Sequence, residues 1–89
     1  MTRKEMLDTC ESFVTKDREA THGSPEDSFG LIARYWSVYL GIELSSTDVA
    51  GLMILLKVAR SKHKPTNTDN WIDIAGYAAC GCELAMGES

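Results

Sequence analysis

The stretch that decides the fold is Leu55–Ala79, LLKVARSKHKPTNTDNWIDIAGYAA. It begins in an apolar segment with helical spacing, passes through a polar segment around Pro65, and returns to helical spacing. Proline disfavours helix at the residue before it, and the nearby Thr and Asn side chains offer local hydrogen bonds in place of helical ones. Helices joined by so short a connection normally lie antiparallel. The stretch therefore predicts an antiparallel helical hairpin.

Charged residues interrupt both arms of this hairpin. Lys57 lies in an arm that is apolar nearly all round, and Arg60 follows one turn later on the same side. Asp69 and Asp73 share a face of the other arm, with Tyr77 a further turn along. In an antiparallel hairpin, Lys57 and Arg60 can reach Asp73 and Asp69. The simplest interpretation is a ladder of ion pairs that fixes the register, and the alternative is a ligand site.

Helical spacing elsewhere predicts an all-α protein, since no alternating pattern of useful length indicates a strand. Ser24 followed by Pro25 is a start signal, and Gly41 is placed to end the same helix. A further start is predicted at 46–48, and Thr68 or Asp69 is expected to cap the last helix. The four predicted helices are 2–15, 25–40, 47–62 and 69–86 of a single 1–89 domain.

The last predicted helix is rich in small residues. Ala, Gly and Cys fill most of 75–82, although each Gly in a helix interior costs about 1 kcal/mol. Such a thin surface lets another helix approach closely. The sequence therefore predicts that close packing compensates for the glycines.

Composition limits the classes of function. A chain of 89 residues with 44% hydrophobic and 25% charged residues is expected to form one globular domain. Its net charge of −4 argues against a duplex nucleic acid partner. No apolar run approaches the ~20 residues that cross a bilayer, and the N-terminal MTRKEMLDTC is charged, so we expect a cytoplasmic protein without a membrane partner. The three cysteines lack zinc or redox spacing and are expected to be reduced.

The predicted helix 25–40 has more apolar surface than one core face requires. Phe29, Trp36 and their helical neighbours form the expected core stripe, while Tyr35 and Tyr39 widen the apolar surface beyond it. A small domain gains stability from association. We therefore expect a homo-oligomer that uses a surface formed by Tyr35, Trp36 and Tyr39.

Three further residues are weighed as candidates for function. His22 lies in a loop just before a helix start, where function and simple solvation are both common. Trp71 lies on the first turn of the last helix and suits either a core or a base-stacking role. His63 is interpreted as a solvated residue at a helix C-terminus. Asp69 and Asp73 alone would supply few ligands for a magnesium ion.

The order of these motifs from Lys16 to Ala79 resembles a family of small phage and prophage domains. It is also similar to the nucleotide modification associated domains, which share a Lys-Asp…His-Gly loop, a Lys-x-x-Arg helix and an Asp-x-x-x-Asp-x-x-x-Tyr helix. The matching positions here are Lys16, Asp17, His22, Gly23, Phe29, Lys57, Arg60, Asp69, Asp73 and Tyr77. A more distant resemblance is to the MazG-like all-α nucleoside triphosphate pyrophosphohydrolases, but their paired-glutamate E-x-x-E motif is absent from this chain. The resemblance implies a helical, nucleotide-linked fold more strongly than hydrolysis.

Three hypotheses of function follow. The first is a non-catalytic phage protein that sequesters a nucleotide or nucleotide-derived signal, with Lys57, Arg60 and His22 on phosphate and Tyr77 or Trp71 against a base. The second is a Mg²⁺-dependent MazG-like pyrophosphohydrolase in which Asp69 and Asp73 hold the metal. The third is an inhibitor or scaffold that binds another protein through the tyrosine-rich surface. We favour nucleotide sequestration narrowly over pyrophosphate hydrolysis.

Overall fold

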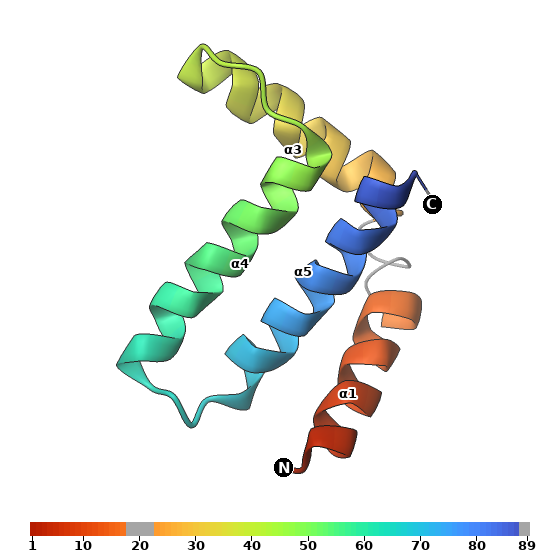
Figure 1. The fold of residues 1–89 in the computed structure, drawn as a ribbon, viewed down its shortest axis with the longest axis vertical. Coiled ribbons are helices and arrows are strands. Elements are labelled where there is room, and N and C mark those ends of the chain that lie inside the picture. Colours follow the sequence, from red (N-terminus) through yellow and green to blue (C-terminus); the bar gives the residue numbers. More distant parts are fainter. Residues whose placement is uncertain (18–22, 88–89) are drawn as a thin grey trace.

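Four α-helices account for most of the computed structural model, which describes residues 1–17 and 23–87 (Figure 1). They are α1 Arg3–Ser12, α3 Pro25–Leu40, α4 Ser46–His63 and α5 Thr68–Met86. The all-α prediction is confirmed, and the predicted bounds of the last three helices agree to within one residue. The first helix is shorter than predicted, because its last turn widens into a π-helical segment, η1 Phe13–Asp17.

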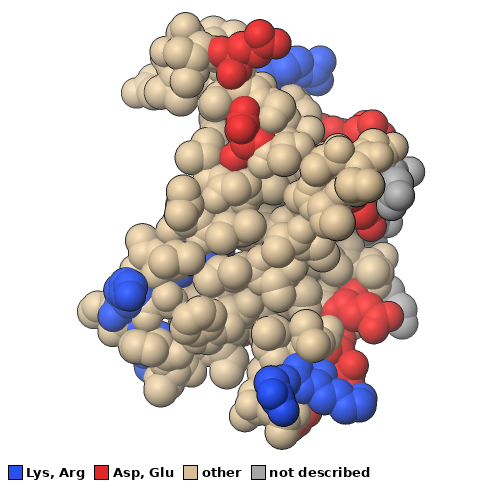
Figure 2. Space-filling view, viewed as in Figure 1, with Lys and Arg blue, Asp and Glu red and all other residues tan. Residues whose placement is uncertain are grey.

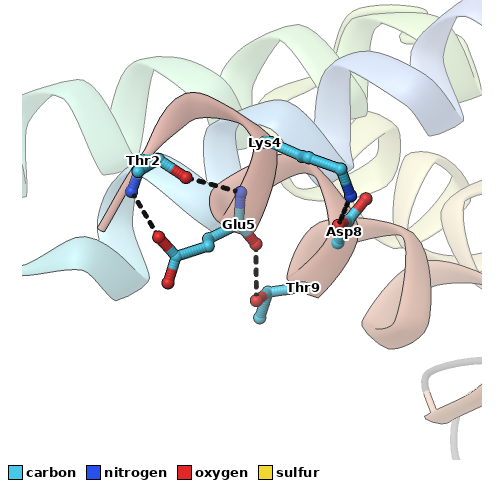
Figure 3. A network of polar contacts seen from close by, with 5 residues as sticks. All are labelled: Thr2, Lys4, Glu5, Asp8 and Thr9. Carbon is cyan, nitrogen blue, oxygen red and sulfur yellow. Dashed lines mark hydrogen bonds and ion pairs between the residues drawn. The ribbon is translucent and has the colours of Figure 1, made fainter.

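A reciprocal capping box starts α1 (Figure 3). The Thr2 hydroxyl oxygen accepts from the Glu5 N–H at 3.1 Å, and the Glu5 carboxylate accepts from the Thr2 N–H at 3.2 Å. These hydrogen bonds to Thr2 hold the pKa of the Glu5 carboxyl below its ordinary value, because they favour the charged form. One turn on, Lys4 and Asp8 form an exposed i,i+4 ion pair of 2.7 Å.

The predicted signals at the two ends of α3 are confirmed. The Ser24 hydroxyl accepts from the Asp27 N–H at 3.2 Å, and Pro25 occupies the first turn, where its missing N–H costs nothing. Gly41 ends the helix with φ +71°, a left-handed conformation that favours glycine. The N–H of Gly41 donates to the Ser37 carbonyl at 2.9 Å.

The other two caps lie one residue earlier than the predicted signals. α4 is capped by Ser45, whose hydroxyl accepts from the Asp48 N–H at 3.1 Å while the Asp48 carboxylate accepts from the Ser45 N–H at 2.9 Å. α5 is capped by Asn67, whose side-chain oxygen accepts from the Asp69 N–H at 3.1 Å. A Ser–x–x–Asp pair closes a capping box that Ser46 cannot make with Asp48, since the spacing would be one residue too short.

α4 and α5 form the predicted antiparallel hairpin and share the most extensive contact between elements (Figure 1). The Trp71 indole N–H donates to the Pro65 carbonyl at 2.8 Å and so ties the connecting loop to the first turn of α5. α1 runs along the other side of α5 and parallel to it. Each flank of α5 is therefore covered by a different helix.

Two glycines of α5 permit this double coverage. A Cβ built on Gly76 would lie 2.9 Å from Val14 Cγ1, and one built on Gly81 would lie 3.2 Å from Ala50 Cβ. The first approach is made by η1 and the second by α4. The prediction that this small-residue surface is closely approached by another helix is confirmed, and two elements approach it.

The core lies where α3 crosses the open end of the hairpin. Its buried members come from three helices: Phe29, Ala33, Val49, Ala50, Tyr77 and Cys80. Trp36 packs against this cluster from its edge and is only partly exposed, so it belongs to the core side of α3, unlike Tyr35 and Tyr39. Within the described residues, no helix is long and apolar enough to cross a membrane.

Candidate functional site

The candidate site is built around an ion pair between the two arms of the hairpin. Lys57 Nζ of α4 lies 2.9 Å from Asp73 Oδ2 of α5, and the two side chains are 14% and 31% exposed. Burying an ammonium to this degree is costly unless a carboxylate lies beside it. The inner rung of the predicted ladder is therefore formed.

The outer rung is not formed. Among the described residues, Arg60 and Asp69 are both exposed and no ion pair within 4.0 Å joins them. The reason is the helical phase of α4, in which Ser61, four residues after Lys57, takes the inward position. Ser61 is 4% exposed and satisfies its hydroxyl by donating to the Val58 carbonyl at 2.7 Å. Arg60 consequently extends into solvent.

A thiol from α1 lies on the other side of the ion pair. Cys10 is buried, and its pKa is raised above the ordinary thiol value, first by burial and then by the negative charge of Asp73. Asp73 therefore lies within electrostatic reach of both neighbouring helices. Sequence reasoning gave Cys10 no place in the site, because the position of α1 beside α5 is a property of the folded chain.

Tyr77 is part of the core. It is 9% exposed, and its ring centroid lies 6.0 Å from that of Phe29 with the planes tilted by 41°. The ring thus packs between α5 and α3. Phe29 therefore occupies space beside the Tyr77 ring that a stacked base would need.

Trp71 lies away from the ion pair. It is two residues from Asp73 on α5, which places it on nearly the opposite side of the helix. There it borders an open cavity of about 310 Å³ between the first turns of α1 and α5. The cavity is lined by Met1, Thr2, Arg3, Met6, Thr68 and Trp71. Sequence reasoning missed this cavity, because it depends on how α1 packs against α5.

The remaining predicted residues can be placed only in part. His22 lies outside the described residues, and Lys16 and Asp17 are described only by the π-helical course of their backbone. The described part of the chain contains no group of three or more His, Cys, Asp or Glu side chains that could hold a metal ion.

Positive charge gathers at the end of α4 next to the ion pair. Four of the nine Lys and Arg residues of the chain fall between 57 and 64, a segment without any acid. Cations near a helix C-terminus are stabilised by the helix dipole. The acidic chain therefore has a local basic region, formed by Lys57, Arg60, Lys62 and Lys64, where phosphate groups would be attracted.

The fold and site together define a small all-α protein built on a helical hairpin with a partly buried ion pair. The chain belongs to the family described as "Domain of unknown function (DUF6378)", whose model matches residues 5–85. It is similar to the "Gene 55 protein" of Mycobacterium phage D29, with 40% identity over 75 residues, which cover 84% of this chain and 50% of that protein. The "Gene 55 protein" of Mycobacterium phage L5 is 38% identical over 74 residues, covering 82% of this chain and 47% of that protein.

The chain thus spans about half the length of the curated relatives that it matches. No solved structure matches it. Both relatives are phage proteins, which agrees with the phage part of the resemblance. Neither name refers to a nucleotide or to a MazG-like enzyme.

Proposed function

We propose that this protein binds the phosphate groups of a nucleotide or nucleotide-derived signal and holds the molecule without transforming it. The observation that carries the proposal is the placement of Lys57. Its ammonium is held at 2.9 Å from Asp73 and 14% exposed, on a helix whose neighbouring residues are apolar. Asp73 fixes the direction of the ammonium, and two further donors of the –NH₃⁺ group are free to bind an anion.

Arg60 supplies the second contact. It is exposed, lies one turn from Lys57, and makes no ion pair with a described residue. A guanidinium binds phosphate oxygens with two parallel hydrogen bonds, which an ammonium cannot do. Together Lys57 and Arg60 provide an ammonium held in a fixed position and a guanidinium on a flexible side chain, a combination suited to binding several linked phosphate groups.

Binding is favoured over hydrolysis by the shortage of carboxylates. A magnesium-dependent pyrophosphohydrolase positions its metal with carboxylates and substrate phosphates. Within the described residues, Asp73 is already paired with Lys57, and Asp69 is not part of any group of three potential metal ligands. This is the physical basis for preferring sequestration.

Isothermal titration calorimetry with nucleoside mono-, di- and triphosphates, with and without Mg²⁺, tests the proposal. Replacing Arg60→Ala should weaken binding by about tenfold or more, because a charged hydrogen bond contributes roughly 1.5–3 kcal/mol. Arg34→Ala is the matched control, since Arg34 is an exposed arginine on α3, away from the basic region. Equal losses in both variants, or no heat of binding from any nucleotide, would contradict the proposal.

Lys57→Met separates a ligand site from a purely structural ion pair. At a ligand site it should abolish binding, while the free energy of unfolding changes by less than about 1 kcal/mol, because Asp73 retains access to water. A purely structural pair predicts that binding is unchanged in the same variant. Urea unfolding followed by circular dichroism, measured beside the titrations, verifies that the variant remains folded.

A further inference from the structure

The second half of α3 is apolar on sides that nothing covers. Tyr35 is 68% exposed, Val38 83% and Tyr39 88%. Ile42, just past the end of the helix, is 57% exposed. Single exposed apolar residues are ordinary on protein surfaces, but a contiguous group of this kind marks an interaction site.

The core-facing stripe of α3 is also left uncovered at its C-terminal end. Ala33, Trp36 and Leu40 follow one another at helical spacing, yet their exposure rises from 4% at Ala33 to 54% at Leu40. The cause is the crossing of α3, which extends beyond the edge of the hairpin (Figure 1). We name residues 35–42 the overhang. Apart from Trp36 and Ser37, which are partly buried, the overhang is therefore mainly apolar and exposed.

A second uncovered apolar surface lies on α4. Leu52, Leu55 and Leu56 are 40%, 64% and 39% exposed, and helical spacing puts them on the side opposite to Ala50 and Lys57, which face α5. We name residues 52–59 on this side the outer face of α4. In Figure 2 the left edge of the molecule is hollowed between the end of α3 and the lower part of α4, and the surface there is largely uncharged.

We propose that a second copy of this chain fills this hollow. In the resulting two-fold dimer, the outer faces of the two α4 helices lie antiparallel, and the overhang of each copy covers the C-terminal half of α4 in the other. Such an interface is isologous, so each contact occurs twice. The proposal extends the surface predicted from sequence: Tyr35 and Tyr39 are retained, Trp36 is assigned to the core, and α4 is added.

The available area suits a stable dimer. The two tyrosines of the overhang expose roughly 300 Å² between them, since a tyrosine presents about 150–250 Å². Six aliphatic side chains bring the total to the order of 800 Å² per copy, which is what a specific interface requires. They are Val38, Leu40, Ile42, Leu52, Leu55 and Leu56.

The charges along α4 are self-complementary in the same arrangement. On its outer side, Asp48 lies one turn before Leu52, and the exposed Lys62 lies two turns after Leu55. A two-fold axis between Leu55 and Leu56 places the Asp48 end of one helix against the Lys62 end of the other. Two copies with a net charge of −4 each can therefore approach through this surface without opposing like charges.

Sedimentation velocity on the full 89-residue chain across a concentration series tests the dimer. The parent protein should be dimeric, and Tyr39→Glu and Leu55→Glu should each weaken association by at least about thirtyfold, as expected for hot-spot residues. Leu7→Glu is the matched control, since Leu7 is 57% exposed on α1, and it should leave association unchanged. Circular dichroism of each variant verifies that the helices remain folded.

Cross-linking tests the arrangement itself. In a background of Cys82→Ser, which removes the exposed native thiol, mixed Leu55→Cys and Leu56→Cys chains should form an intermolecular disulfide, because these two positions face each other across the two-fold axis. A parent protein that stays monomeric at every concentration would overturn the proposal and leave the surface to a partner of another sequence. A dimer that survives both glutamate substitutions would overturn it as well, because a different surface would then be in use.

Discussion

The substitution Gly76→Ala tests the close contact between η1 and α5. In an open helix position, alanine is more stable than glycine by about 1 kcal/mol. At Gly76 the added Cβ would lie 2.9 Å from Val14 Cγ1, closer than real Cβ contacts allow. Relieving such overpacking costs about 1–3 kcal/mol. The expected net result is a loss of about 1 kcal/mol in the free energy of unfolding.

Gly51→Ala is the matched control, because a Cβ at Gly51 in α4 would meet nothing within 4 Å. It should gain the full helical preference, so the difference between the two variants isolates the steric cost at Gly76. In a chain of this size 1 kcal/mol shifts the melting temperature by about 4–8 °C, which circular dichroism resolves easily.

A double-mutant cycle identifies the partner. In a Val14→Ala background the Cγ1 atom is gone, so Gly76→Ala should become neutral or stabilising there. If Gly76→Ala stabilises the parent as much as Gly51→Ala does, η1 does not pack against α5 as described, and the reasoning is refuted.

Three other predictions follow from individual contacts. Because Cys10 is buried and the pKa of its thiol is raised, it should react with iodoacetamide much more slowly than exposed Cys82 at pH 8, as mass spectrometry of the alkylated peptides would show. The free energy of unfolding should fall as the pH rises past the ordinary thiol pKa, because only the unfolded state ionises there. Urea unfolding at a series of pH values checks this. Thr2→Ala should cost about 1 kcal/mol by removing the N-cap of α1, and an unchanged unfolding curve would refute the cap's contribution. Trp71→Phe should cost roughly 0.5–1.5 kcal/mol by losing the hydrogen bond to Pro65, with increased amide exchange confined to the hairpin loop.

Sequence reasoning succeeded where local physics decides the structure. The hairpin follows from the proline in the loop and from helical spacing on both sides, and the Lys57–Asp73 pair follows from the antiparallel arrangement. The ends of α3 follow from Ser24 and Gly41, whose conformational preferences do not depend on distant residues.

Sequence reasoning failed where the orientation of a helix relative to its neighbours determines which side chains meet. Lys57 has possible inward neighbours at both Arg60 and Ser61, and only the packing of α4 against α5 selects Ser61. Tyr77 continues the face of Asp73, but α3 brings Phe29 against it. The overhang could be anticipated only as excess apolar surface, because the crossing position of α3 is a tertiary property.

The most direct test of the central claim is native mass spectrometry of the protein purified from a nucleotide-rich lysate, with and without Mg²⁺. Sequestration predicts an added mass corresponding to an intact nucleotide, in stoichiometric amount, which is lost in Lys57→Met and which chromatography identifies after release. Bare protein that takes up no nucleotide on addition would contradict the account, and so would magnesium-dependent conversion of added triphosphate to monophosphate and pyrophosphate.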